Sequence, residues 1–524
     1  MKIFNIINDL LGKNTQFISY AIFVFFTCLY FSSTVGGMNS GDSSQFALTK
    51  SIVDHQTFQI DKNINWTYWT DYVTINNHYY LDREPGLSIL AIPFYLTSKI
   101  TSAFAVPLYG GFNRNINSDS IIQAFTYLTT AVFGALGIVI LYKICLTFQI
   151  SQLSAFFTAI IMGTGTLFWK YSSSFFREPV FTTFFLLTIY LFLIIQKSKK
   201  NQAKYLFFAG LSLGISILVD YSKFYLIPFF IIYHSLLKKP NLSNKKRSLL
   251  FFLGLSIPLI FIFYYNFQVF QNPFTNPHLH KNYFKWMQNP DNLFKTPLIP
   301  GIITNLFNNG PINRGLLEFF WQNPYISFQM GAYWATVWTY KGIFIQTPVL
   351  FLAIFGWFIF LKKFRKEALL LLISSICILI INSKMTVFWA GPSYDTRYFL
   401  PVPIILLIGL PFHLDYIFKL KNRFKKLFLF GLFLYLSLIS IYNGWYSNLT
   451  NFAPHLSGEH RFYWESLLHP FWNWNNLFVN FRILIFNSFP NVYNLDVFLT
   501  FYLFPFSILY MIYLYFKYPK KENE

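Results

Sequence analysis

Two segments after the first long apolar stretch hold the residues best suited to chemistry. Gly41-Asp42 follows that stretch directly, and Tyr80-Leu81-Asp82-Arg83-Glu84-Pro85-Gly86 closes the same polar loop. A carboxylate can accept a proton, and a guanidinium can bind a phosphate group. Ionisable groups at membrane depth are costly and usually mark function. This spacing suits an enzyme that takes a group from a lipid phosphate, with Asp42 as base and Arg83 as phosphate ligand.

Three further polar clusters, around Arg177, Lys341 and Arg397, stand where apolar stretches begin. Lys341 ends a long polar segment, and Arg397 precedes an apolar run, so each is a candidate ligand for the lipid phosphate. Candidate contacts to substrate are the neighbouring polar residues Glu84, Arg177, Glu178, Tyr394 and Asp395.

Each of these residues also has a purely structural interpretation. In this interpretation Asp42 is a helix N-cap without a catalytic role, and Arg83 is an anchor at the membrane interface without a ligand. Arg177 and Glu178 can pair with each other, as can Asp395 and Arg397. Both interpretations stay open on the residues alone.

The metal signal is weak. His278 and His280 have suitable spacing, but no third ligand is evident. No cofactor is therefore certain, a divalent cation remains possible, and its ligands are unknown.

Composition defines the class of protein. Of 524 residues, 54% are hydrophobic and only 12% are charged, whereas soluble domains average about 25% charged residues. We therefore predict an all-α polytopic membrane protein with about 12–13 transmembrane helices. The net charge of +21 comes largely from basic loops between apolar runs, which argues against nucleic acid as a partner.

The apolar runs predict the positions of the helices. In the first polar loop we also expect an amphipathic helix over 43–58, capped by Asp42, with Phe46, Ile52 and Val53 toward lipid. The predicted membrane helices are 17–35, 87–105, 120–142, 152–169, 179–196, 204–219, 222–237, 248–265, 343–361, 367–383, 398–417, 427–443 and 494–516.

Basic segments predict the topology. Lysine and arginine concentrate in Lys197 to Lys204, Lys238 to Arg247, Lys362 to Lys366, Lys419 to Lys426 and Lys517 to Lys521, which we expect to be cytoplasmic. Both termini then lie in the cytoplasm, and the candidate site faces outward. The helix count between 87 and 169 is odd where this topology needs an even one, so we expect one segment between 105 and 169 to cross only partly.

The same pattern suggests three parts. These are an N-terminal transmembrane module, 1–265, with an outer loop at 36–86; a large outer loop, 266–342; and C-terminal membrane helices, 343–524, with an outer segment at 444–493.

Four motifs, taken in order, resemble the GT-C superfamily of membrane glycosyltransferases. The similarity is greatest to the branch with protein O-mannosyltransferases and lipid A aminoarabinose transferases. The motifs are Gly41 to Ala47, Tyr80 to Ser88 followed by Ala91-Ile92-Pro93, Lys341 to Leu350, and Trp389 to Pro401. Arg83 stands where the family usually has lysine, and Ser43 where many members have glutamate, which weakens any expectation of a metal.

The resemblance implies a bundle of GT-C type in the cell membrane and a polyprenyl-phosphate sugar donor. It also implies an outward-facing site in which Asp42 activates a glycan, lipid or protein acceptor. A single displacement of the lipid phosphate would invert the anomeric carbon. Two alternatives remain open: a flippase or transporter of a lipid-linked glycan, and a glycan polymerase or ligase.

Overall fold

The computed structural model describes residues 15–34, 40–110, 118–197, 201–237, 243–282, 285–310, 312–316, 340–390 and 396–449. Tyr394, Asp395, the predicted helix 494–516 and most of the predicted outer segment 444–493 lie outside these ranges. Residues 444–449 are helical and continue the preceding helix.

The first half of the described chain is helical apart from one hairpin. Its elements are α2 (Thr15–Ser32), α3 (Ser40–His55), η1 (Asp61–Thr67), β1 (Tyr72–Ile75), β2 (His78–Leu81), α4 (Gly86–Leu90), α5 (Ile92–Gly110), α6 (Ser118–Thr126), α7 (Leu128–Thr147), α8 (Gln152–Thr164), α9 (Phe168–Ser172), α10 (Arg177–Lys197), α11 (Gln202–Val219), η2 (Tyr221–Leu226), α12 (Ile227–Ser235) and α13 (Asn244–Phe270).

The second half contains short helices followed by longer ones. They are η3 (Pro277–His280), η4 (Lys285–Gln288), η5 (Pro290–Asn292), α14 (Leu298–Phe307), η6 (Arg314–Leu316), α18 (Ile343–Gln346), α19 (Leu350–Lys363), α20 (Arg365–Lys384), η7 (Arg397–Phe399), α21 (Pro401–Leu407), α22 (Leu410–Lys419) and α23 (Arg423–Leu449).

Among the described residues, eight helical segments are long and apolar enough to cross a membrane, which confirms the all-α polytopic class. The predicted count was higher because it included α5, shorter helices such as α8 and α19, and the segment 494–516. The eight segments are Thr15–Ser32, Ile122–Thr147, Arg177–Lys197, Gln202–Val219, Asn244–Phe270, Arg365–Lys384, Pro401–Lys419 and Arg423–Trp445.

Prolines divide four helices that the apolar pattern predicted as continuous. Proline lacks an N–H group and disfavours helical geometry in the residue before it. Pro93 therefore stands at the start of α5, separated from α4, and Pro348 lies between α18 and α19. Pro228 and Pro411 stand in the same way near the starts of α12 and α22.

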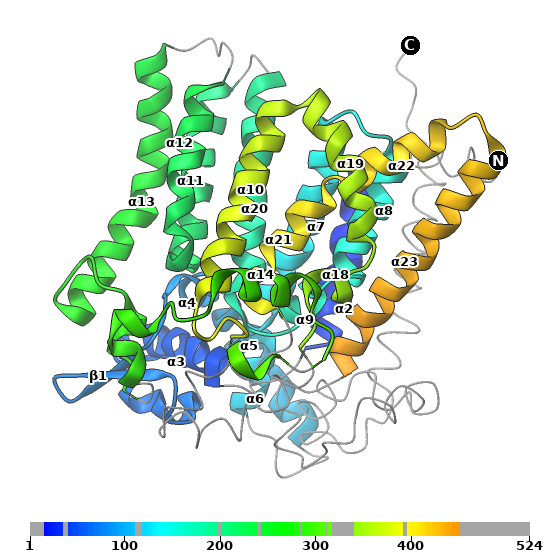
Figure 1. Cartoon of the computed structure of the whole chain (residues 1–524). Helices are drawn as coiled ribbons and strands as arrows, with labels where there is room; N and C mark the ends of the chain where they lie inside the picture. The colour runs from blue at the N-terminus through cyan, green and yellow to red at the C-terminus, as the bar shows by residue number, and fades with distance from the viewer. Residues whose placement is uncertain are drawn as a thin grey trace, which may run out of the picture.

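The long helices run between two ends of the bundle (Figure 1). At one end, here named the basic end, α10, α12, α19 and α22 finish and α11, α13, α20 and α23 begin. At the other, here named the site end, lie α3, α4, α5 and the β1–β2 hairpin. The predicted basic loops Lys362 to Lys366 and Lys419 to Lys426 thus lie at the end opposite the candidate site, whereas Lys517 to Lys521 lies outside the described residues.

The helices α5 and α8 bear on the odd count between 87 and 169. The helix α5 lies with α3 and α6 at the site end (Figure 1). In contrast, α8 runs between the ends, because Ser151 before it bonds Asp415 of α22 and Gly165 after it bonds Thr347. Neither α5 nor α8 is among the candidate spans, so the partial crossing between 105 and 169 stays a prediction.

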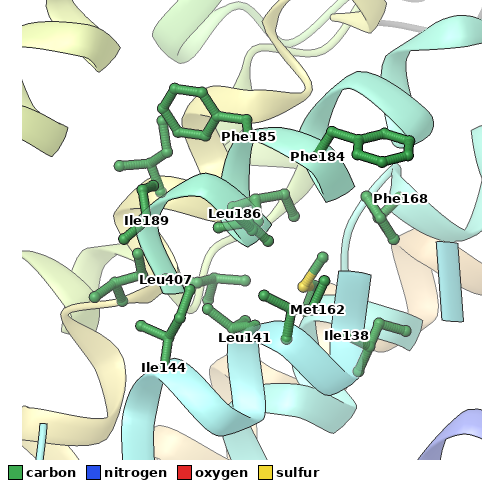
Figure 2. Close-up of a cluster of buried hydrophobic side chains, with 14 of the residues drawn as sticks. Ile138, Leu141, Ile144, Met162, Phe168, Phe184, Phe185, Leu186, Ile189 and Leu407 are labelled. Carbon is green, nitrogen blue, oxygen red and sulfur yellow. The ribbon is translucent and has the colours of Figure 1, made fainter. Parts of the chain in front are cut away.

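Apolar side chains of α7, α8, α10 and α21 form the centre of the bundle. Figure 2 shows Ile138, Leu141, Met162, Phe185 and Leu407 meeting there. On one side of this core, α11 and α13 approach each other very closely. A Cβ at Gly210 would lie 2.0 Å from the Phe251 carbonyl oxygen, so only glycine fits.

The first polar loop folds onto the bundle. Antiparallel strands β1 and β2 meet at Asn76-Asn77, both with positive φ, as a two-residue hairpin turn requires. The predicted amphipathic helix exists as α3, but it begins at Ser40, and Phe46 is fully buried against Trp66 and Tyr95. The expectation that Phe46 faces lipid is wrong, because α5 and η1 cover that face.

Candidate active site at one end of the bundle

The first turn of α3 holds Asp42. Its side chain is buried, and its Oδ1 accepts the Ser43 backbone N–H at 2.8 Å. Asp42 therefore lies inside the first helical turn and is not the N-cap that the pattern predicted. The pKa of Tyr68 is raised, first by the burial of its phenol and second by the negative charge of Asp42. A phenol therefore lies near the candidate base.

Arg83 lies against the same turn and is bound by two carboxylates. Its Nη2 is 2.7 Å from Asp71 Oδ1, its Nε is 2.8 Å from Asp82 Oδ1, and its Nη1 donates to the Gly41 carbonyl at 3.0 Å. Burial alone would lower the pKa of Arg83, but the charges of Asp71 and Asp82 raise it. The guanidinium is thus permanently charged and held next to Asp42.

A lysine from the segment after α13 joins this group. Lys281 Nζ lies 2.6 Å from Asp82 and 3.5 Å from Asp71. The next residue, Asn282, fixes its place by bonding the β1 residue Thr74 through both backbone N–H and side chain. Although burial would raise the pKa of Asp82, Arg83 and Lys281 hold it far below its usual range.

Glu84 connects this group to the start of α10. Its carboxylate pairs with Arg177, and Arg177 Nη2 lies 3.8 Å from Asp220, which pairs in turn with Lys223 at 3.2 Å. Gly86 brings the two parts together, because α4 packs directly on the end of α11. A Cβ there would lie 2.4 Å from the Leu218 carbonyl oxygen.

Glu178 and Arg397 form the next link. Arg397 Nε lies 3.3 Å from Glu178 Oε1, and Nη2 donates to the Ala390 carbonyl. The guanidinium also stacks on Phe176, 4.5 Å from its ring centroid, and on Tyr398. Burial would lower the pKa of Arg397, but Glu178 raises it, and Arg83 is close enough to act in the opposite direction.

The structure therefore brings together six of the predicted residues. Arg83 bonds Gly41, the neighbour of Asp42, and ion pairs join Glu84 to Arg177 and Glu178 to Arg397. Glu84 follows Arg83 directly in the chain, and Glu178 follows Arg177. Lys341 also lies at the site end, where its backbone forms a bridge with Asn309 beside α14. The roles assigned to these residues, and to Tyr394 and Asp395, stay predictions.

Several residues of the network were missing from the predicted site. They are Asp71, Asp82, Lys281, Asp220 and Lys223. Asp82 stood inside the predicted motif, and Asp220-Tyr221-Ser222-Lys223 was a visible polar break between apolar runs. Asp71 and Lys281 carried no local signal, because only the folded hairpin brings them to Arg83.

Lys170 on α9 is a further charged residue at this end that the pattern did not indicate. Its side chain is fully buried, and burial lowers the pKa of its ammonium to about 7. A lysine with such a pKa can exchange a proton near neutral pH. Its place on α9, directly before α10, puts it in the same layer as Arg177.

The two histidines of the predicted metal motif point to different partners. His280 contacts Thr275 at 2.7 Å and stacks on Phe270, whereas His278 lies 4.0 Å from Glu84. Over the residues that the structure describes, no group of three or more histidine, cysteine or acidic side chains is placed to hold a metal. A divalent cation stays an untested expectation.

One family model matches part of the chain, between the second and third motifs. Residues 106–265, from the end of α5 into α13, match the family model of dolichyl-phosphate-mannose-protein mannosyltransferases. This range includes Arg177 and Glu178 but not Asp42, Arg83 or Arg397. No curated protein matches the chain.

Two solved structures of ArnT from Cupriavidus metallidurans are similar in outline. The structure bound to undecaprenyl phosphate is 13% identical with a TM-score of 0.42, covering 90% of this chain and 76% of that one. The apo structure is 14% identical with a TM-score of 0.39 and the same coverage. These scores are too low to establish a common fold, so the identification depends on the family model and the motifs.

Over residues 106–265 the chain is thus similar to a family of membrane mannosyltransferases, which supports its resemblance to the GT-C superfamily of membrane glycosyltransferases.

Proposed function

We propose that the protein transfers a sugar from a polyprenyl-phosphate donor to an acceptor outside the cytoplasm. The observation that carries this proposal is the convergence of Asp42, Arg83 and Arg397 at one end of a membrane bundle. The family model adds a donor class, because its description names a dolichyl-phosphate-linked mannose. The sugar and the acceptor of this chain are left open.

The proposed reaction is a single displacement. An acceptor hydroxyl attacks the anomeric carbon, its proton passes to Asp42, and the bond from that carbon to the phosphate oxygen breaks. The products are an inverted glycoside and free polyprenyl phosphate. A positioned base of this kind contributes about 10²–10⁴-fold.

Cations are needed because charge accumulates on the leaving group. The phosphodiester of the donor has one negative charge, and the released phosphate monoester approaches two. Arg83 and Arg397 are buried and fixed by their partners, so their charges act without much solvent screening. Lys341 is a third candidate cation. Glu178 pairs with Arg397, and the pair of Glu84 with Arg177 lies between the two arginines as a candidate contact to the substrate.

Charge distribution supports an outward-facing site. Lysine-rich turns such as Lys362 to Lys366 and Lys419 to Lys426 lie at the basic end, opposite Asp42 (Figure 1). Basic loops concentrate on the cytoplasmic side of membrane proteins. We therefore place the site end outside the cytoplasm.

The test is sugar transfer in proteoliposomes from a panel of radiolabelled polyprenyl-phosphate sugars. Wild type should transfer from at least one donor, and Asp42→Asn should lose about 10²-fold or more. Asp54→Asn is the matched control on the same helix, because Asp54 pairs with Lys99 and Tyr95 at the far end of α3. It should transfer normally per folded molecule.

Two outcomes would contradict the proposal. Near-normal transfer by folded Asp42→Asn would remove Asp42 as the base. Movement of the lipid-linked sugar between leaflets without transfer would instead support the flippase alternative. The anomeric configuration of the product, read by NMR, separates inversion from retention.

A further inference from the structure

Asp71 occupies the position between two cations of the proposed donor site. Its Oδ1 lies 2.7 Å from Arg83 Nη2 and 3.5 Å from Lys281 Nζ. Its Oδ2 accepts the hydroxyl of Ser40, which begins the helix that carries Asp42. One carboxylate therefore connects the phosphate ligand, the segment after α13 and the catalytic helix.

The two carboxylates on Arg83 are not equivalent. Asp82 is fully buried, contacts Nε at 2.8 Å and Nη2 at 3.4 Å, and also binds Lys281 at 2.6 Å. Asp71 is 11% exposed and contacts only the outer nitrogen of the guanidinium. Asp82 is thus the permanent partner that orients Arg83, and Asp71 is the partner that can leave.

The backbone before Asp71 has an unusual conformation. Tyr68 and Trp69 both have left-handed φ values, 50° and 56°, which cost L-residues energy. Trp69 packs on Tyr72 and Tyr79, so its contacts lie within the same loop. The ion pairs of Asp71 connect this loop to Arg83 and Lys281.

A lipid phosphate would compete for the same donors. A phosphate oxygen and a carboxylate oxygen accept the same N–H groups from arginine and lysine. The two positive charges of Arg83 and Lys281 are balanced by the two negative charges of Asp71 and Asp82, so these four side chains together have no net charge. An entering anion meets net positive charge only after Asp71 withdraws.

We propose that Asp71 is a displaceable internal counter-ion that holds the place of the lipid phosphate on Arg83 and Lys281. Donor binding pushes it out, and its return helps to expel the polyprenyl phosphate product. Displacement also frees Ser40, so phosphate binding is linked to the start of α3. This inference rests on the proposed function, because it needs a lipid phosphate at Arg83.

The test is binding of undecaprenyl phosphate to the full chain in nanodiscs. Removing the competing charge should make Asp71→Asn bind about 10-fold more tightly, which corresponds to about 1.4 kcal/mol. Asp61→Asn is the matched control, since Asp61 lies in the same loop but pairs with His78 on the exposed side of the hairpin. Its affinity should equal that of wild type.

A second measurement uses the unmodified protein and does not depend on how the variant folds. Hydrogen exchange of the peptide that covers residues 66–75 should increase when undecaprenyl phosphate is added, because Asp71 loses its anchors. Equal or weaker binding by Asp71→Asn, or slower exchange in the wild type, would overturn the inference while leaving the proposed donor intact. Absence of any binding by wild type would overturn both.

Discussion

The two ends of the bundle treat charge in opposite ways. At the basic end, cations bind backbone carbonyls where helices finish: Arg247 donates to His234, Lys366 to Leu236 and Lys426 to Phe418. Carbonyls at helix ends can accept such bonds, and cations there also complement the helix dipole. Each such contact stabilises a helix end and nothing more.

Carboxylates at the basic end likewise bind neutral donors. Asp415 accepts the backbone N–H and hydroxyl of Ser151 and the hydroxyl of Ser154, which joins α22 to the start of α8. Glu367 accepts from Gln196 and Tyr233. At the site end, by contrast, Asp71, Asp82, Glu84 and Glu178 all pair with arginine or lysine.

This difference separates structural charge from charge available to a ligand. A cation bound to a backbone carbonyl has a fixed partner that no solute can replace. A cation bound to a carboxylate can exchange that partner for another anion, such as a phosphate. The site end is therefore the part of the described chain equipped to bind an anionic substrate.

Removing an arginine from each end should give the sharpest contrast. Arg397→Gln should lower transfer about 10²–10³-fold, because it removes a buried charge from the leaving group. Arg247→Gln, which loses only contacts to His234 and Asn244, should transfer normally per folded molecule. Initial rates in proteoliposomes, normalised to folded protein, provide the comparison.

Arg397→Lys tests whether geometry matters in addition to charge. Lysine keeps the charge but loses the planar stack on Phe176 and Tyr398. We expect its transfer rate to lie between wild type and Arg397→Gln. Equal losses in Arg397→Gln and Arg247→Gln would remove the distinction between the ends.

Acid should weaken the site end through Asp82. Its pKa is lowered in the folded protein, so its contribution to stability is complete above the ordinary carboxyl pKa of about 3.9 and disappears as the pH falls further. Asp82→Asn should be less stable than wild type at pH 7 by about 1–3 kcal/mol. It should also lose less stability on acidification.

Thermal unfolding in detergent at pH values between about 5 and 2 measures this difference. Asp54→Asn serves as the comparison, because the pKa of Asp54 is also lowered but its partners Lys50 and Lys99 lie away from Arg83. Parallel pH profiles for wild type and Asp82→Asn would contradict the assignment of Asp82 as the fixed partner.

At the basic end, Glu367→Gln should have the smallest effect. The substitution preserves an acceptor for Gln196 and Tyr233 but removes the charge that strengthens both bonds. We expect a stability loss of about 1 kcal/mol and unchanged transfer per folded molecule. The melting temperature in detergent and the transfer rate are the two readouts, and a specific loss of transfer would show that this end also takes part in the reaction.

The sequence predicts the bundle better than it predicts the site. Apolar length identifies α2, α7, α10, α11, α13, α20 and α23, because membrane spans depend on composition alone. The helix breaks at Pro93 and Pro348 follow from the backbone geometry of proline. The apolar pattern does not show them, because it continues through both prolines. The position of α5 at the site end depends on its packing against α3 and α6, which no local pattern contains.

Within the site, residues in recognisable motifs were found and those brought in by tertiary structure were not. Asp42, Arg83 and Arg397 stand beside turns at the ends of apolar runs, where functional groups are expected. Lys281 reaches Asp82 only because Asn282 bonds β1, and Asp71 reaches Arg83 only through the hairpin. Lys281 and Asp71, which these contacts bring together, lie 210 positions apart in the sequence.

The central claim is that carboxylates at the site end act in the reaction and those at the basic end act in stability. The most direct test compares Asp42→Asn with Asp415→Asn in single-turnover transfer and in thermal unfolding. We predict that Asp42→Asn loses about 10²-fold or more in rate with a similar melting temperature, whereas Asp415→Asn melts lower but transfers normally when folded. Normal transfer by Asp42→Asn, or a comparable rate loss in folded Asp415→Asn, would contradict the account.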